Sequence, residues 1–172
     1  MSLARGMFHF AHRLFPAKVA YAHCDIPCGI YDPHLAQLAA LTVIRMNQLI
    51  QGLKRPGPGA PPQEVDAYNA ELGRLVAVKE HHAEVCKQEL RIFWGDYFKP
   101  EHLQQVPDLH DKFWKAMKLA STTRQKNDLK AAQDLLATVQ DIAEAFWKTK
   151  GAQVRRQPSR QTAGGELVYP AP

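Results

Sequence analysis

The chain has 172 residues, with 22 lysines and arginines against 17 aspartates and glutamates and a formal net charge of +5. This length suits one domain with appendages, and a hydrophobic content of 45% is enough to bury a core. Three cysteines are too few for a disulfide scaffold, and no apolar run is long enough for a transmembrane helix, so we expect no membrane partner.

The positive charge lies at the two ends of the chain. Residues 1–22 hold three basic residues and no acidic one, residues 151–172 hold three arginines and one glutamate, and residues 23–150 are net neutral. A neutral middle with basic ends does not indicate a basic binding face, so we expect no nucleic-acid partner. Nucleic-acid binding through the two ends remains the weakest alternative.

We interpret residues 1–22 as a leader that is removed. Histidine, arginine, proline and lysine interrupt every apolar stretch in it, whereas a secretory signal needs about 7–15 uninterrupted apolar residues. A propeptide cut by a dedicated peptidase, an organelle transit peptide and a disordered arm all fit this composition. Reduced thiols favour the cytoplasm, and the acid-free leader leaves import into an organelle open.

Residues 34–150 are predicted to form an all-α, antiparallel four-helix bundle. Apolar residues recur at helical spacing in four segments, and the proline- and glycine-rich segment 52–63 must separate the first two. The helices are expected from Pro33 to about residue 52, over Glu64–Trp94, from Pro107-Asp108 to Ser121–Thr123, and over Asn127–Lys150. We expect residues 151–172 to be a disordered tail.

The apolar stripes of these helices predict the core. The expected inward residues are Leu35, Leu38, Thr42, Met46, Leu49 and Leu53; Tyr68, Leu72, Leu75, His82, Cys86 and Phe93; Leu109, Phe113, Met117 and Ala120; and Leu135, Val139, Ile142 and Phe146. The three tryptophans are predicted to be core residues as well.

The densest group of reactive side chains lies in residues 23–33, HCDIPCGIYDP, which we interpret as a metal-binding hook. Pro27 and Gly29 favour a turn that brings Cys24 and Cys28 toward one centre. Thiolates are soft ligands for zinc, copper(I), iron–sulfur clusters or nickel. A lone pair of cysteines three residues apart is a weak motif, and a redox dithiol or two reduced cysteines fit it too.

Backbone ligands change this reading. If the leader is cut between Ala22 and His23, His23 gains an α-amine with an ordinary pKa of about 7.7–8.0. That amine, the amide nitrogen of Cys24 and the thiolates of Cys24 and Cys28 form a square of two nitrogens and two sulfurs, which nickel(II) or copper(II) prefers. The imidazole of His23 is within reach of an axial position.

The hook resembles the nickel hook that opens mature nickel superoxide dismutases. WGDYFKP (94–100) is similar to the second signature of that family, and PDLH (107–110) and FWKTK (146–150) follow in the same order. The resemblance covers residues 23–150. It implies an enzyme that disproportionates superoxide to dioxygen and hydrogen peroxide by cycling between Ni(II) and Ni(III), with one nickel ion per subunit, a maturation peptidase and a homohexamer of four-helix bundles.

The resemblance also implies roles for single residues. His23, Cys24 and Cys28 would hold the nickel ion, and the amide groups of Asp25 and Cys28 would point toward the substrate. Tyr31 would stand over the open axial face, with Tyr97 supporting it by a hydrogen bond. Lys99 would lie near the entrance and attract the superoxide anion.

Two positions depart from the family pattern. Familiar members hold the axial histidine with a glutamate and an arginine, where this chain has Ala39 and His82. Because such outer partners tune the metal, we expect a different axial network, with His82 either in contact with the hook or packed between helices. Cys86 is most simply a packing residue.

The alternative function is a non-catalytic one. A thiol-based metal carrier or a regulatory binding module would use Cys24 and Cys28 to hold metal without turnover.

Overall fold

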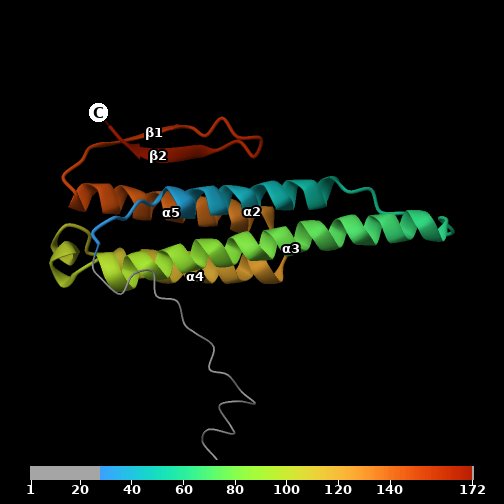
Figure 1. Cartoon of the computed structure of the whole chain (residues 1–172), viewed down its shortest axis with the longest axis horizontal. Coiled ribbons are helices and arrows are strands. Elements are labelled where there is room, and N and C mark those ends of the chain that lie inside the picture. The colour runs from blue at the N-terminus through green and yellow to red at the C-terminus, as the bar shows by residue number, and fades with distance from the viewer. Residues whose placement is uncertain (1–27, 172) are drawn as a thin grey trace, which may run out of the picture.

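The computed structural model describes residues 28–171, and the leader and His23, Cys24 and Asp25 lie outside these residues. Four long helices occur in chain order: α2 (His34–Gly52), α3 (Pro62–Ile92), α4 (Leu109–Gln125) and α5 (Leu129–Thr149). Each packs against its neighbours in the chain, and α2 packs against α5 to close the bundle. Figure 1 shows α2 and α5 in one layer and α3 and α4 in the other. The four-helix bundle predicted from the sequence is therefore confirmed.

Local sequence explains where these helices start and stop. Prolines at the start of α3 suit its first turn, where no backbone donor is needed. Asp128 caps α5 by accepting a hydrogen bond from the amide of Ala131 at 2.9 Å. Asp108 makes no such capping bond to α4 and pairs instead with Lys112. No helix within residues 28–171 is both long and apolar enough to cross a membrane.

The predicted core faces hold for two helices and fail for a third. The four residues predicted for α5 are buried, as are Leu109, Phe113 and Ala120 of α4. The face predicted for α2 is wrong: Leu35 is 49% exposed, whereas Ala36, Ala39, Ala40, Leu41, Val43 and Ile44 are buried. Because α2 contacts α3, α5 and strand β2, its buried surface is wide and formed largely of small residues.

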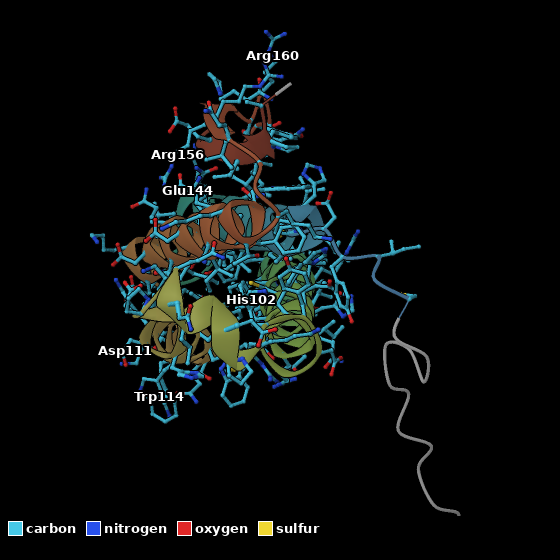
Figure 2. The ribbon with its side chains drawn as sticks, turned by 90° about the vertical axis from the view of Figure 1, so that its left-hand side faces the viewer. His102, Asp111, Trp114, Glu144, Arg156 and Arg160 are labelled. Carbon is cyan, nitrogen blue, oxygen red and sulfur yellow. The ribbon has the colours of Figure 1, made fainter. Side chains whose placement is uncertain are left out.

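Two tryptophans also differ from the prediction. Trp94 is 47% exposed and Trp114 is 63% exposed, so neither belongs to the core. The indole N–H of Trp94 donates to Nδ1 of His110 at 3.0 Å, and the ammonium of Lys118 lies 4.2 Å from the ring centre of Trp114. Figure 2 shows Trp114 pointing away from the bundle.

The predicted disorder of the tail is wrong, because the tail folds as a β-hairpin. β1 (Val154–Pro158) and β2 (Glu166–Pro170) pair antiparallel, with Gln157 opposite Leu167. The hairpin covers the α2–α5 layer (Figure 1), and Leu167 and Val168 are almost fully buried there. Gly165, at φ +75°, ends the hairpin turn so close to Leu41 and Leu136 that a side chain would crowd them.

Polar bonds fix this hairpin to the helices. The side chain of Gln37, fully buried, accepts from the amide of Val168 at 2.8 Å and donates to its carbonyl at 3.1 Å. Gln140 donates to the carbonyl of Glu166 at 2.6 Å, and Arg156 binds the carboxylates of Asp141 and Glu144. These helix residues supply the partners that the tail's own sequence does not reveal.

Candidate functional site at the hook end of the bundle

The first described residues lie at the end of the bundle where α3 and α5 both terminate. The ring of Tyr31 lies 5.3 Å from that of Tyr97 and 6.2 Å from that of Phe93, measured between centroids. Asp32 accepts a hydrogen bond from the amide of His34 at 2.8 Å, a turn that leads into α2. The segment before α2 is therefore packed against the end of α3.

A short π-helix, η1 (Phe93–Tyr97), sets the direction of the aromatic side chains there. The amide of Phe98 donates to the carbonyl of Phe93 at 2.9 Å, a five-residue step that widens the last turn. Phe93 is buried against Phe146, while Tyr97 stays half-exposed and faces Tyr31. Single π-turns of this kind occur often at functional sites.

Tyr97 is held by its hydroxyl and by its ring. Its hydroxyl oxygen lies 2.7 Å from Oγ1 of Thr149, and that threonine hydroxyl donates its proton to the carbonyl of Phe146 at 2.7 Å. Because the single threonine proton is used there, Tyr97 is the donor to Thr149. Since the Tyr97 hydroxyl proton is used in this way, a hydrogen bond between the two tyrosines would have to be donated by Tyr31 and accepted by Tyr97. A hydrogen bond between the two tyrosines stays a prediction.

A pocket of about 330 Å³ opens beside the two tyrosines. It is lined by Gly29, Tyr31, Asp96, Tyr97, Lys99, Glu101, His102 and Lys150. Two lysines and two carboxylates face it, and within residues 28–171 none of these four groups is in an ion pair. The ammonium of Lys150 lies 5.5 Å from the ring centres of Tyr97 and Phe146. The pocket is small, polar at its rim and aromatic at its floor.

The structure brings three of the predicted site residues to this pocket and leaves others untested. Tyr31, Tyr97 and Lys99 line it, and Cys28 is exposed next to Gly29 in its wall. The proposed ligands His23 and Cys24, and Asp25, lie outside the described residues. Among residues 28–171 no group of three or more histidine, cysteine, aspartate or glutamate side chains could hold a metal ion.

His82 and Cys86 of α3, the two other residues weighed for the site, lie away from the pocket. Cys86 is fully buried in the core, and burial raises the pKa of its thiol to about 12, so it is a packing residue. Nδ1 of His82 donates to the carbonyl of Val78 at 2.9 Å within the same helix. His82 precedes the end of α3 by ten residues, roughly 15 Å of helix.

Sequence reasoning missed three residues of this site. All three contact Tyr97. The ring of His102 stacks on the Tyr97 ring, the hydroxyl of Thr149 is hydrogen-bonded to the Tyr97 hydroxyl, and the ammonium of Lys150 lies over the face of the Tyr97 ring. Thr149 and Lys150 fall inside FWKTK, so the motif pointed at them without giving a role. His102 has no cluster partner in the sequence, because its partners are a backbone amide and a ring face.

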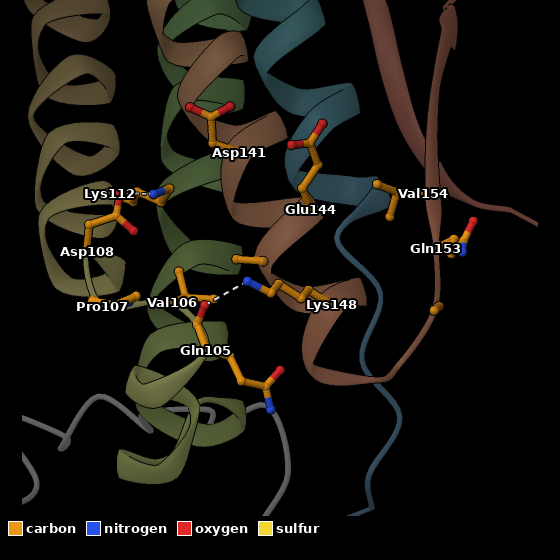
Figure 3. Close-up of a pocket in the computed structure, with 12 residues that line it drawn as sticks. Gln105, Val106, Pro107, Asp108, Lys112, Asp141, Glu144, Lys148, Gln153 and Val154 are labelled. Carbon is orange, nitrogen blue, oxygen red and sulfur yellow. Dashed lines mark hydrogen bonds and ion pairs between the residues drawn. The ribbon is translucent and has the colours of Figure 1, made fainter.

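A larger cavity lies elsewhere, between the start of α4, α5 and β1 (Figure 3). Its volume is about 500 Å³. Asp108 is paired with Lys112, and Lys148 donates to the carbonyl of Gln105 at 2.8 Å. The two remaining acids, Asp141 and Glu144, bind Arg156. Since each charged group already has a partner, nothing in this cavity requires a ligand.

The four-helix bundle carries at one end an aromatic pocket with two lysines, next to an exposed cysteine, a residue type that binds soft metal ions as its thiolate. The chain matches the family of nickel-containing superoxide dismutases over residues 18–150. It therefore belongs to that family.

Named relatives and solved structures agree with this assignment. The nickel superoxide dismutase of Streptomyces seoulensis is 36% identical over 144 residues, covering 81% of this chain and 98% of the relative. The Streptomyces coelicolor enzyme is 34% identical over 141 residues, with the same coverage. A native nickel superoxide dismutase structure superposes with a TM-score of 0.63 at 31% identity, covering 74% of this chain and 99% of the other.

Proposed function

We propose that this chain disproportionates superoxide at a nickel ion held by the hook of residues 23–33. As a member of its family the protein is a nickel-dependent oxidoreductase with superoxide as substrate. The observation that carries the site assignment is the pocket beside the hook, where Tyr31, Tyr97 and Lys99 meet although they are up to 68 residues apart in the chain.

The residues of the hook fit the metal by their chemistry. His23 would supply its amine and imidazole, Cys24 its amide nitrogen and thiolate, and Cys28 its thiolate. Anionic amide and thiolate donors suit nickel, and the exposure of Cys28 leaves its sulfur accessible. Nickel bound there would supply a one-electron redox centre, so that one superoxide is oxidised to dioxygen and the next is reduced, with two protons, to hydrogen peroxide.

The chain's own residues bind and orient the substrate. Tyr31 and Tyr97 form an aromatic wall that limits the space to a small molecule and orders water or peroxide. Lys99 at the rim attracts the anion, and the amides of Asp25 and Cys28 would point at the substrate. Removing either lysine would leave two carboxylates against one cation, which would weaken the attraction for superoxide.

A contact between His82 and the hook stays a prediction. Its hydrogen bond to Val78 supports the simpler alternative of a histidine satisfied within its own helix. If His82 contacts the hook, His82→Ala should change turnover and the spectrum of the bound nickel. Unchanged values for both would reject it.

Processing and assembly complete the proposal. A maturation peptidase would cut between Ala22 and His23 and so free the α-amine of His23. We propose a homo-oligomer, a hexamer by the family resemblance, in the cytoplasm. The exposed tryptophans Trp94 and Trp114 support assembly, because exposed aromatic residues are enriched in protein interfaces.

Two cysteine variants test the proposal with a matched control. Cys28→Ser removes a proposed ligand, so the processed chain should lose bound nickel and superoxide turnover. Cys86→Ala changes a buried thiol that the site does not use, and should keep one nickel ion per subunit and most of the turnover. Nickel retained without turnover in the unaltered protein would support the metal-carrier alternative, and full activity of Cys28→Ser would contradict the ligand assignment.

A further inference from the structure

The residue that carries a further inference is His102, which stands between Lys99 and Tyr97 in the pocket. It lies in the short 3-10 helix η2 (Pro100–Gln104), which follows Lys99 directly. Figure 2 shows His102 at the hook end of the bundle, between the helices. Its ring stacks on that of Tyr97, with centroids 5.6 Å apart and planes 21° apart, and meets Phe98 edge-on.

The second contact of His102 is to the backbone. Nδ1 of His102 accepts the amide N–H of Lys99 at 3.1 Å, and the carbonyl of Lys99 accepts the amide of His102 at 3.0 Å. This reciprocal pair closes the first turn of η2, as a glutamate or glutamine does in a capping box. Because Nδ1 is an acceptor, the proton of the neutral ring is on Nε2.

The two contacts connect the rim of the pocket to its aromatic wall. Lys99 has an exposed, flexible side chain, so the place of its ammonium depends on where its backbone is held. The backbone of Lys99 is extended, at φ −120° and ψ 162°, and the bond to His102 fixes it in this form at the pocket. The same imidazole stacks on the ring of Tyr97, which in turn contacts Tyr31.

We propose that His102 is a positioning residue for superoxide capture, which holds Lys99 at the mouth of the pocket through the bond from the Lys99 amide to Nδ1. The inference rests on the proposed function, since it concerns the approach of superoxide to the same site. His102 itself transfers no electron in this proposal. Its effect reaches the substrate through the charge of Lys99.

Two substitutions separate the acceptor from the ring. His102→Gln keeps an acceptor at the third position of the turn and loses the ring, whereas His102→Phe keeps the ring and loses the acceptor. In the nickel-loaded, processed protein at low salt, His102→Phe should lower kcat/KM by about 3-fold to 10-fold with kcat little changed, because steering by charge acts on capture. The loss should shrink at high salt. His102→Gln should stay within about 2-fold of the unaltered protein.

A second measurement uses the nickel-free protein and is independent of activity. Nitrogen NMR of the imidazole should show an unprotonated Nδ1 and a protonated Nε2 for His102. Hydrogen exchange at the Lys99 amide should be slow in the unaltered protein and in His102→Gln, and at least about 10-fold faster in His102→Phe, because the amide then lacks its partner.

The outcomes distinguish this inference from the proposed function. No turnover by the unaltered, nickel-loaded protein would contradict the proposed function itself. Normal turnover together with a His102→Phe variant that matches it at every salt concentration would overturn the role of His102 alone. An equal loss in both variants would also overturn the proposal, because it would assign the effect to the ring.

Discussion

The bond between Gln37 and the C-terminal hairpin gives a quantitative prediction. Gln37→Met keeps the length of the side chain but removes both hydrogen bonds to Val168, a residue of β2 that is buried between the hairpin and the helices. A buried donor or acceptor that loses its partner costs about 1–3 kcal/mol, so the two groups together should cost about 2–4 kcal/mol after some relaxation. For a chain of this size, this corresponds to a fall in Tm of roughly 5–15 °C.

A matched control makes this prediction sharp. Gln48→Met removes the bond from the side chain of Gln48 to the carbonyl of Ala163 and a long bond, of 3.4 Å, that Gln48 accepts from Arg45. Because this position is half-buried and water can replace both partners, the change should cost about 1 kcal/mol or less. Both variants are compared by thermal unfolding at equal protein concentration, with hydrogen exchange of the Val168 amide. If Gln37→Met costs no more than Gln48→Met and the Val168 amide exchanges as before, the docking of the hairpin described above is wrong.

Two further predictions concern charge and pH. Lys150→Gln should slow turnover at low salt by about 3-fold to 10-fold and flatten its dependence on ionic strength, whereas Lys130→Gln, at the start of α5 far from the pocket, should change neither. Burial raises the pKa of the Cys86 thiol from 9.0 to about 12, so the protonated thiol is favoured in the folded state. Its contribution is complete below pH 9 and is lost as the pH rises toward 12, at about 1.4 kcal/mol per pH unit. The free energy of unfolding, measured by chemical denaturation between pH 9 and 11, should therefore fall less steeply with pH for Cys86→Ala than for the unaltered protein, and equal slopes would contradict the burial argument.

The bundle could be predicted because its signals are local. The stripe of Leu135, Val139, Ile142 and Phe146 repeats at helical spacing, and all four of these large apolar residues are buried, so the pattern maps onto the core directly. In α2 the same helical spacing predicted a stripe of mainly large residues, beginning at Leu35, as the buried face. The structure instead buries the alanines Ala36, Ala39 and Ala40. A helix packed on three sides admits small residues where neighbours approach closely, and sequence spacing alone does not show how many neighbours there are.

The hairpin could not be predicted because its stability comes from distant residues. Each strand is only five residues long, and an isolated two-stranded hairpin is marginal in water. The prolines, glycines and arginines of the tail therefore resemble a disordered segment. Its partner Gln37 is 131 residues away from Val168, and nothing in either local sequence indicates that they meet.

Some residues of the candidate site could likewise be predicted from the sequence, and others could not. The family signatures identified the hook, Tyr31, Tyr97 and Lys99, and the structure places the last three at one pocket. Thr149 and His102 act through a hydroxyl bond and a backbone amide, which depend on the π-turn of η1 and the cap of η2 rather than on a residue pattern.

The central claim is that nickel is bound by a chain that begins at His23. The intact mass of the active, nickel-loaded protein tests it most directly, measured on the fraction that turns over superoxide. We predict the mass of residues 23–172 with one nickel ion per subunit, and no turnover by chains that keep the leader. An active, nickel-loaded protein that still carries residues 1–22 would contradict it, because the amine of His23 would then be part of a peptide bond.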